Sequence, residues 1–209
     1  MVSNFDFLKK DFPVLSNFGE MAEKYSNSCL MKLGMIGETI VNLMFTYDRI
    51  AFPHDNTAVA RIDTLSREGL LTSDLVTILH GLRKVRNKAV HENYASIADD
   101  KTFLPMAHSL CEWFMQTYGD WNYSHKDFVM PEENTVSVTV DKEAEEKKES
   151  ELTKLAEQTA AAAPIVEQTE RKKQAYKAAN QRPKTEAETR FLIDEQLRMV
   201  GWDADTENL

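Results

Sequence analysis

Two side chains with complementary chemistry lie five positions apart in the middle of the chain, Arg86 and His91, and Asn87 directly follows the arginine. A guanidinium group can stabilise the negative charge that builds up on a phosphate as one of its ester bonds breaks. A histidine can take a proton from a hydroxyl group or return one to a leaving oxygen, because its pKa lies near neutrality. The two residue types together thus have the chemistry to act on a phosphate ester.

The segment that carries both residues is expected to form a helix from residue 75 to about residue 91. Its apolar residues recur at helical spacing and, on a wheel with about 100° per residue, fall within about 60° of Leu82. This core face consists of Leu75, Ile78, Leu79, Val85 and Ala89. The polar residues take the other side of the helix: His80, Arg83, Lys84, Asn87 and His91. We expect this polar face to contact nucleic acid or a partner protein.

Arg86 does not follow this division of the helix. It lies about 40° from Leu82, within the apolar face, where an unpaired guanidinium would be strongly unfavourable. A carboxylate should therefore neutralise it, and Glu38, at the edge of an earlier apolar stripe, is the expected partner in a structural ion pair. Arg86 and His91 also diverge by about 140° on one helix, so a site that uses both side chains would need two chains facing each other as a homodimer. Structural pairing, binding and catalysis are thus three alternatives for this segment.

Residues 1–130 are expected to form one compact all-α bundle of four or five helices. Residues 17–48 contain a long helical pattern, and Asn56 or Thr57 can cap a shorter helix that ends at Gly69. A last helix carries a stripe of methionine and aromatic residues, which is typical of a core: Phe103, Met106, Trp113 and Phe114.

The composition changes after residue 131. Residues 131–184 are rich in Glu, Lys, Ala and Gln, which favours a charged, partly helical and solvated linker interrupted at Pro164. Residues 135–140 alternate between polar and apolar, as in a short strand or an extended tether. Residues 185–209 form the third predicted unit, a helix with an acidic first turn that ends at Gly201. Only eight residues follow Gly201, so we expect this helix to open a further domain of a longer protein.

The overall charge argues against broad binding to phosphate backbones, because 34 acidic residues outnumber 25 basic ones. The two cysteines, Cys29 and Cys111, are isolated, which favours reduced thiols packed as small hydrophobic groups. His108 and Cys111 have a spacing compatible with zinc, but a second pair of ligands is missing nearby, so we expect no metal site. A signal peptide and a membrane-spanning segment are not apparent, and we expect a cytoplasmic protein.

Two blocks of sequence resemble a known family. The pattern Glu-Ala-Glu-Thr-Arg-x3-Asp-x2-Leu-x3-Gly-Trp, residues 186–202, is similar to the start of the nuclease domain in R subunits of type I restriction enzymes. Some R subunits also begin with a helical domain that contains a block similar to residues 80–92, and a charged linker joins the two parts. The chain therefore resembles the N-terminal part of an R subunit.

This resemblance implies a non-catalytic accessory module of a DNA restriction enzyme. The R subunit is an endonuclease and translocase that uses ATP and Mg²⁺, but the Gly-x4-Gly-Lys-Ser/Thr loop of an ATPase does not occur in this sequence. We therefore expect no cofactor in this chain. The implied partners are the methylase and specificity subunits and DNA, and membranes are not among them. The string from Arg86 to His91 also resembles the Arg-x4-His motif of the HEPN superfamily, which implies a HEPN-like bundle and the ribonuclease alternative. Related domains can have arginine at the position of Gly34 and glycine at the position of Arg86.

Overall fold

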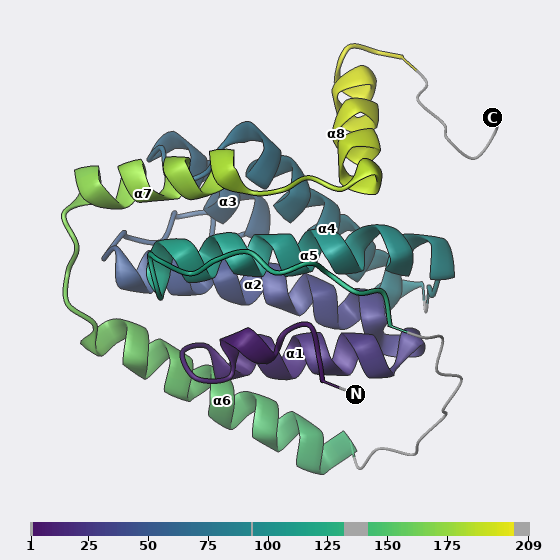
Figure 1. Cartoon of the computed structure of the whole chain (residues 1–209), viewed down its shortest axis with the longest axis horizontal. Helices are drawn as coiled ribbons and strands as arrows, with labels where there is room; N and C mark the ends of the chain where they lie inside the picture. Colours follow the sequence, from purple (N-terminus) through teal and green to yellow (C-terminus); the bar gives the residue numbers. More distant parts are fainter. Residues whose placement is uncertain (1, 93, 132–141, 203–209) are drawn as a thin grey trace.

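The computed structural model describes residues 2–92, 94–131 and 142–202, and every regular element within these ranges is a helix (Figure 1). The all-α class expected from the sequence is thereby confirmed. The helices have the following bounds: η1 Asp6–Leu8, α1 Pro13–Lys24, η2 Ser26–Ser28, α2 Cys29–Tyr47, α3 Ala58–Arg67, α4 Ser73–His91, α5 Ile97–Tyr118, α6 Lys142–Ala162, α7 Gln168–Gln181 and α8 Glu186–Met199.

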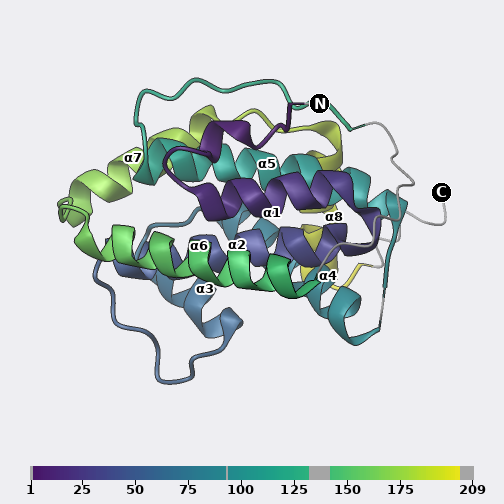
Figure 2. The same ribbon diagram turned by 90° about the horizontal axis from the view of Figure 1, so that it is seen from below.

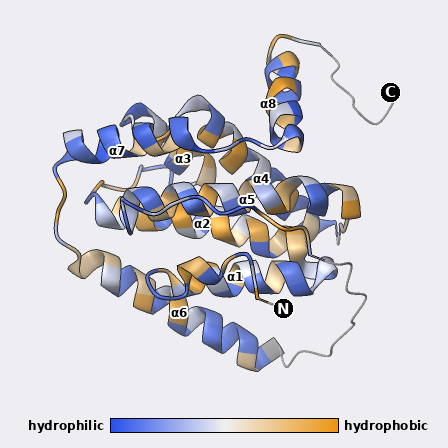
Figure 3. Ribbon diagram, viewed as in Figure 1, coloured by the Kyte–Doolittle hydropathy of each residue, from blue (hydrophilic) through white to orange (hydrophobic). Residues whose placement is uncertain are grey.

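Helix α2 is the centre of the molecule and packs against α1, α3, α4, α5 and α6. Leu33, Ile36 and Ile40 of this helix are fully buried, and Figure 3 shows the apolar residues of the bundle concentrated on α1, α2 and α5. The stretch Ser26–Tyr47 is long and apolar enough to cross a membrane by length and composition. Its neighbours bury most of it, and a helix that is apolar on several faces is expected at the centre of a bundle.

Residues 17–48, which contain the predicted long helical pattern, include the end of α1 and the whole of α2. Pro13 lies in the first turn of α1, where its fixed φ fits and its missing N–H is not needed. The helix ends because Tyr25 is extended, with φ −128° and ψ 95°, and the short η2 then leads into α2. The apolar periodicity continues across this break because both helices contribute to one core.

The ends of α3 follow the sequence prediction. The Thr57 side chain accepts a hydrogen bond from Ala60 N at 3.2 Å, which caps the first turn. Gly69 follows the last turn with φ +70°, a conformation that glycine adopts without strain. Helices α1 to α5 all lie within residues 1–130, so the expected bundle of four or five helices is confirmed as five.

Helices α6 and α7 pack on the bundle, contrary to the expectation of a solvated linker in residues 131–184. Helix α6 lies across α1 and α2, and α7 lies along α5, as the two perpendicular views in Figures 1 and 2 show. Each helix buries small side chains one turn apart, Ala156 and Ala160 on α6 and Ala175 and Ala178 on α7. Alanine lets two helices approach closely, so a highly charged helix can pack through a narrow stripe.

Basic side chains of the bundle hold α6 in place. Lys32 is buried on α2 and forms an ion pair with Glu149 of α6. Arg49, which adopts φ +54°, reaches the end of α6 and donates hydrogen bonds to the carbonyl oxygens of Ala160 at 3.2 Å and Ala161 at 2.5 Å. These contacts satisfy carbonyl groups that a helix end leaves without a partner.

Helix α8 stands almost perpendicular to α7 and projects away from the bundle (Figure 1). It contacts α4 and α5, where Phe191 packs on Phe103 with 5.3 Å between ring centroids. Gly201 has φ +83°, and Trp202 N donates to Leu197 O at 3.0 Å, so the predicted glycine stop is confirmed. The strand predicted at 135–140 lies outside the described residues, and the division into three domains stays a prediction.

Candidate functional site

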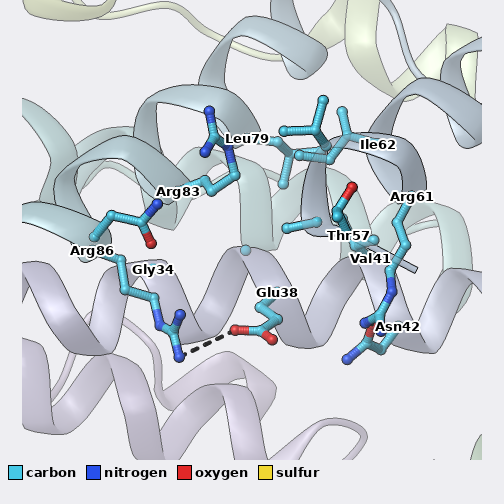
Figure 4. Close-up of a pocket in the computed structure, with 14 residues that line it drawn as sticks. Gly34, Glu38, Val41, Asn42, Thr57, Arg61, Ile62, Leu79, Arg83 and Arg86 are labelled. Atoms are coloured by element: carbon cyan, nitrogen blue, oxygen red, sulfur yellow. Dashed lines mark hydrogen bonds and ion pairs between the residues drawn. The ribbon is translucent and has the colours of Figure 1, made fainter. Parts of the chain in front are cut away.

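A cavity of about 400 Å³ lies between α2, α3 and α4. Arg61, Arg83 and Arg86 line it, and they belong to α3 and α4. Figure 4 shows that Arg86 and Arg61 extend toward α2 on either side of Glu38, whereas the Arg83 guanidinium points away from α2. Apolar side chains complete the walls: Val41, Val59, Ile62 and Leu79. The cavity thus combines three positive groups, one carboxylate and an apolar surface.

Arg86 and Glu38 are close enough to form an ion pair, with Arg86 Nη2 3.4 Å from Glu38 Oε2. Their side chains are 36% and 44% exposed, so the pair lies at the mouth of the cavity and the expected burial of Arg86 in the apolar face was wrong. Gly34 makes room for the arginine on α2, because a Cβ added there would lie 2.2 Å from Arg86 Cβ. The long side chain can therefore cross α2 and reach Glu38.

Two of the lining arginines carry buried donors without an acceptor. The Nε atoms of Arg83 and Arg86 are buried, and neither has a hydrogen-bond partner among residues 2–92, 94–131 and 142–202. Asn87 is exposed and lines the same cavity one turn after Arg83. Buried N–H groups are nearly always paired in folded proteins, so two unpaired donors on the residues that line the cavity are unusual.

The sequence analysis missed Arg61 and Asn42, which belong to α3 and α2. Arg61 Nη1 donates to Asn42 Oδ1 at 2.6 Å, and Arg61 Nε donates to Asn56 Oδ1 at 2.9 Å. Its guanidinium also lies 5.2 Å from the centre of the Phe52 ring. These contacts fix the side chain before any ligand binds. A local motif does not reveal them, because three separate segments meet only in the folded chain.

His80 and Lys84, predicted to belong to the contact face, lie outside the cavity and face other groups. His80 Nε2 is 3.8 Å from Asp63 Oδ1 of α3, and burial followed by the nearby Arg83 charge lowers the pKa of His80. Lys84 Nζ is 2.8 Å from Glu195 Oε2 of α8. The predicted polar face of α4 is therefore divided between α3, the cavity and α8.

His91 is the last residue of α4, is exposed, and is not among the residues that line the cavity. Arg86 turns toward α2 and Glu38, so the two residues of the ribonuclease hypothesis have different surroundings. Since residues five apart on a helix diverge by about 140°, they do not converge within one chain.

A second polar cluster is buried beside the last helix of the bundle. Glu112 of α5 is 1% exposed and accepts hydrogen bonds from Tyr123 Oη at 3.1 Å and Lys126 N at 2.8 Å. His125 Nδ1 lies 3.0 Å from the same carboxylate. These contacts attach the segment after α5 to the core. Groups of three or more His, Cys, Asp or Glu side chains suited to a metal are absent from the described part of the chain.

A buried ion pair fixes the start of α8. Arg182 Nη2 is 2.5 Å from Glu188 Oε1, and Arg182 Nη1 donates to Ser109 Oγ of α5 at 2.8 Å. Glu188 also follows the cap residue Thr185, whose side chain accepts from Glu188 N at 3.1 Å. Because the pair is almost fully buried, the entry into α8 is anchored to α5.

Comparison with known proteins gives two matches. A family profile described as a domain of unknown function (DUF4145) matches residues 19–155, which include the second half of α1 and part of α6. The type I restriction enzyme EcoKI endonuclease subunit of Escherichia coli (strain K12) is 25% identical over 266 aligned positions, which cover 99% of this chain. The chain spans 22% of that protein's length, and the similarity indicates a distant relation to it. No solved structure matches the chain.

Proposed function

The chain belongs to the DUF4145 family, and on that premise we propose that it is a non-catalytic accessory module of a type I restriction endonuclease subunit. The alignment with the EcoKI endonuclease subunit carries the proposal, because it runs over 99% of the chain. It takes in the five-helix bundle, the α6–α7 segment and α8, so the similarity is not limited to one short motif.

The module would act through contacts within a cytoplasmic complex. Its partners would be the methylase and specificity subunits, whereas DNA cleavage and ATP hydrolysis would belong to other parts of the endonuclease subunit. The sequence supports this division, because it contains no Gly-x4-Gly-Lys-Ser/Thr loop to hold the phosphates of ATP. In such a complex the module would serve the restriction of foreign DNA, and a HEPN-like origin of the bundle fits its helical class.

The exposed part of α4 is the proposed docking surface. His80 faces Asp63 of α3, and Lys84 pairs with Glu195 of α8. The rest of the predicted contact face consists of Arg83, Asn87 and His91. Asn87 and His91 are exposed, and Arg83 is intermediate. Charged and polar groups at an interface set orientation and specificity, so these side chains are suited to select a partner subunit.

Co-purification tests this role. The chain of residues 1–209 would carry an affinity tag and be expressed with the methylase and specificity subunits. We expect retention of both subunits, and loss of retention in the triple variant Arg83→Ala, Asn87→Ala, His91→Ala. The matched control is Arg190→Ala, an exposed arginine that pairs only with Glu186 within α8. Absence of both subunits from the purified wild-type chain would rule out docking.

The alternative function is a metal-independent ribonuclease that uses Arg86 and His91 in a homodimer. The exposure of His91 at the end of α4 permits such a dimer contact. Light scattering and an RNA-cleavage assay in EDTA distinguish the two functions. An accessory module leaves RNA intact, whereas a dimer that cleaves RNA and loses activity on His91→Ala would replace the proposed function.

A further inference from the structure

The cavity between α2, α3 and α4 is a positive site on an acidic protein. The chain has 34 acidic and 25 basic residues, yet three arginines and only one carboxylate, Glu38, line this cavity. The Nε atoms of Arg83 and Arg86 are buried without an acceptor in the described residues. An anionic ligand would balance the positive charge of this lining.

The arrangement of the arginines excludes a small anion as the best ligand. Arg61 and Arg86 lie on either side of Glu38 along α2, and Arg83 points away from α2 (Figure 4). Because these guanidinium groups point in different directions, one phosphate ion cannot engage all three. The cavity volume of about 400 Å³ falls within the range of sites for small organic ligands.

The surface between the charges is suited to a flat, weakly polar ring. Val41, Ile62 and Leu79 form an apolar wall there. Amide groups of Asn42 and Asn87 also face the cavity, and amides and carboxylates are the groups that pair with the edges of nucleobases. The lining thus combines a surface for a ring, hydrogen-bonding partners for its edge and guanidinium groups for a phosphate.

We propose that this cavity binds a nucleotide, with the base against the apolar wall and the phosphate on Arg83. A free mononucleotide and one nucleotide of a single strand offer the same chemistry. The site goes beyond subunit docking and does not depend on it. Arg83 and Asn87 belong to both proposals, but ligand binding is measured on this chain alone, without the methylase and specificity subunits.

Binding measurements on the full chain test the proposal. Calorimetry with ATP, GTP, CMP and inorganic phosphate would be combined with fluorescence anisotropy of a short labelled single strand. We expect nucleotide binding that Arg83→Gln weakens roughly tenfold or more, because a charge-assisted hydrogen bond is lost. Arg67→Gln is the matched control, since Arg67 is exposed on α3 and does not line the cavity.

The outcomes separate the sources of the ligand. Binding of a mononucleotide assigns the site to a free nucleotide, and binding of the single strand alone assigns it to nucleic acid. Asn87→Asp, an exposed change that adds a negative charge, should weaken the same binding and serves as the second variant if Arg83→Gln unfolds. The proposal is overturned if neither probe binds, if inorganic phosphate binds as tightly as the nucleotides, or if Arg83→Gln and Arg67→Gln have equal effects.

Discussion

At the scale of single residues, Gly34 determines how α4 presents its arginine. The absence of a side chain at Gly34 lets Arg86 pass over α2, and an added Cβ would lie 2.2 Å from Arg86 Cβ. The two positions therefore compete for the same space. Domains that have arginine at the first position and glycine at the second would deliver a guanidinium to this region from α2 instead of α4.

Gly34→Ala should displace Arg86 and destabilise the protein by about 1–3 kcal/mol, because overpacking forces neighbouring groups to shift. Gly37→Ala is the control on the same helix, since its Cβ would meet Leu82 at an ordinary 3.4 Å. Urea unfolding of both variants measures the difference in the free energy of unfolding. Equal stability of the two variants would show that the Arg86 side chain can move aside without a loss of stability.

Because the two positions compete for the same space, the double variant Gly34→Arg, Arg86→Gly should be more stable than Gly34→Arg alone.

The pairing of Arg86 with Glu38 could be predicted because it depends on helical geometry. A wheel places Arg86 on the same side of α4 as Leu82, but it does not give the exposure of the side chain, which lies at the mouth of the cavity rather than in the core. The structure has the two groups 3.4 Å apart. Arg61 was missed because its approach to Asn42 depends on the crossing of α3 with α2, which apolar spacing within one helix does not determine.

At the scale of elements, the charged segment after residue 131 shows how composition misleads. A low apolar content favours a solvated helix, but α7 buries a stripe of mostly polar and small residues at helical spacing: Arg171, Gln174, Ala175 and Ala178. Trp113 Nε1 donates to Ala175 O at 3.0 Å, and Gln174 Nε2 donates to Gln116 O at 2.8 Å. The composition predicted that the polar side chains of α7 are solvated, but Arg171 and Gln174 each donate a hydrogen bond to a carbonyl oxygen of α5.

Arg171→Met should destabilise the protein by about 3 kcal/mol or more, because it leaves Asp48 buried without its cation. Arg171 Nε is 3.1 Å from Asp48 Oδ1, and both side chains are 4% exposed. The guanidinium also lies 4.3 Å from the centre of the Tyr118 ring and donates to Thr117 O. Chemical unfolding monitored by circular dichroism measures the loss.

The control for this prediction is Lys177→Ala on the exposed side of α7, which should change stability by less than about 0.5 kcal/mol. If Arg171→Met were as stable as this control, α7 would rest on α5 through its alanines alone. The ion pair would then fix only the register of the helix.

At the scale of the whole molecule, the segments that follow the bundle complete its surface. Helix α6 covers α1 and α2, α7 covers α5, and the Arg182–Glu188 pair connects α8 to Ser109. The family profile agrees with this arrangement, since it extends to residue 155 within α6. Helix α8 is therefore held in a defined position against the bundle.

Residues 1–130 alone should consequently be less stable than residues 1–209. The shorter chain loses the partner of Asp48 and the carboxylates that pair with Lys32, and it exposes the surfaces of α2 and α5 that α6 and α7 cover. Because buried apolar surface and ion pairs are lost together, we expect the melting temperature to fall by roughly 10 °C or more. Scanning calorimetry of both chains measures this difference. Equal melting temperatures would instead make residue 130 a true domain boundary and the packed helices a dispensable cover.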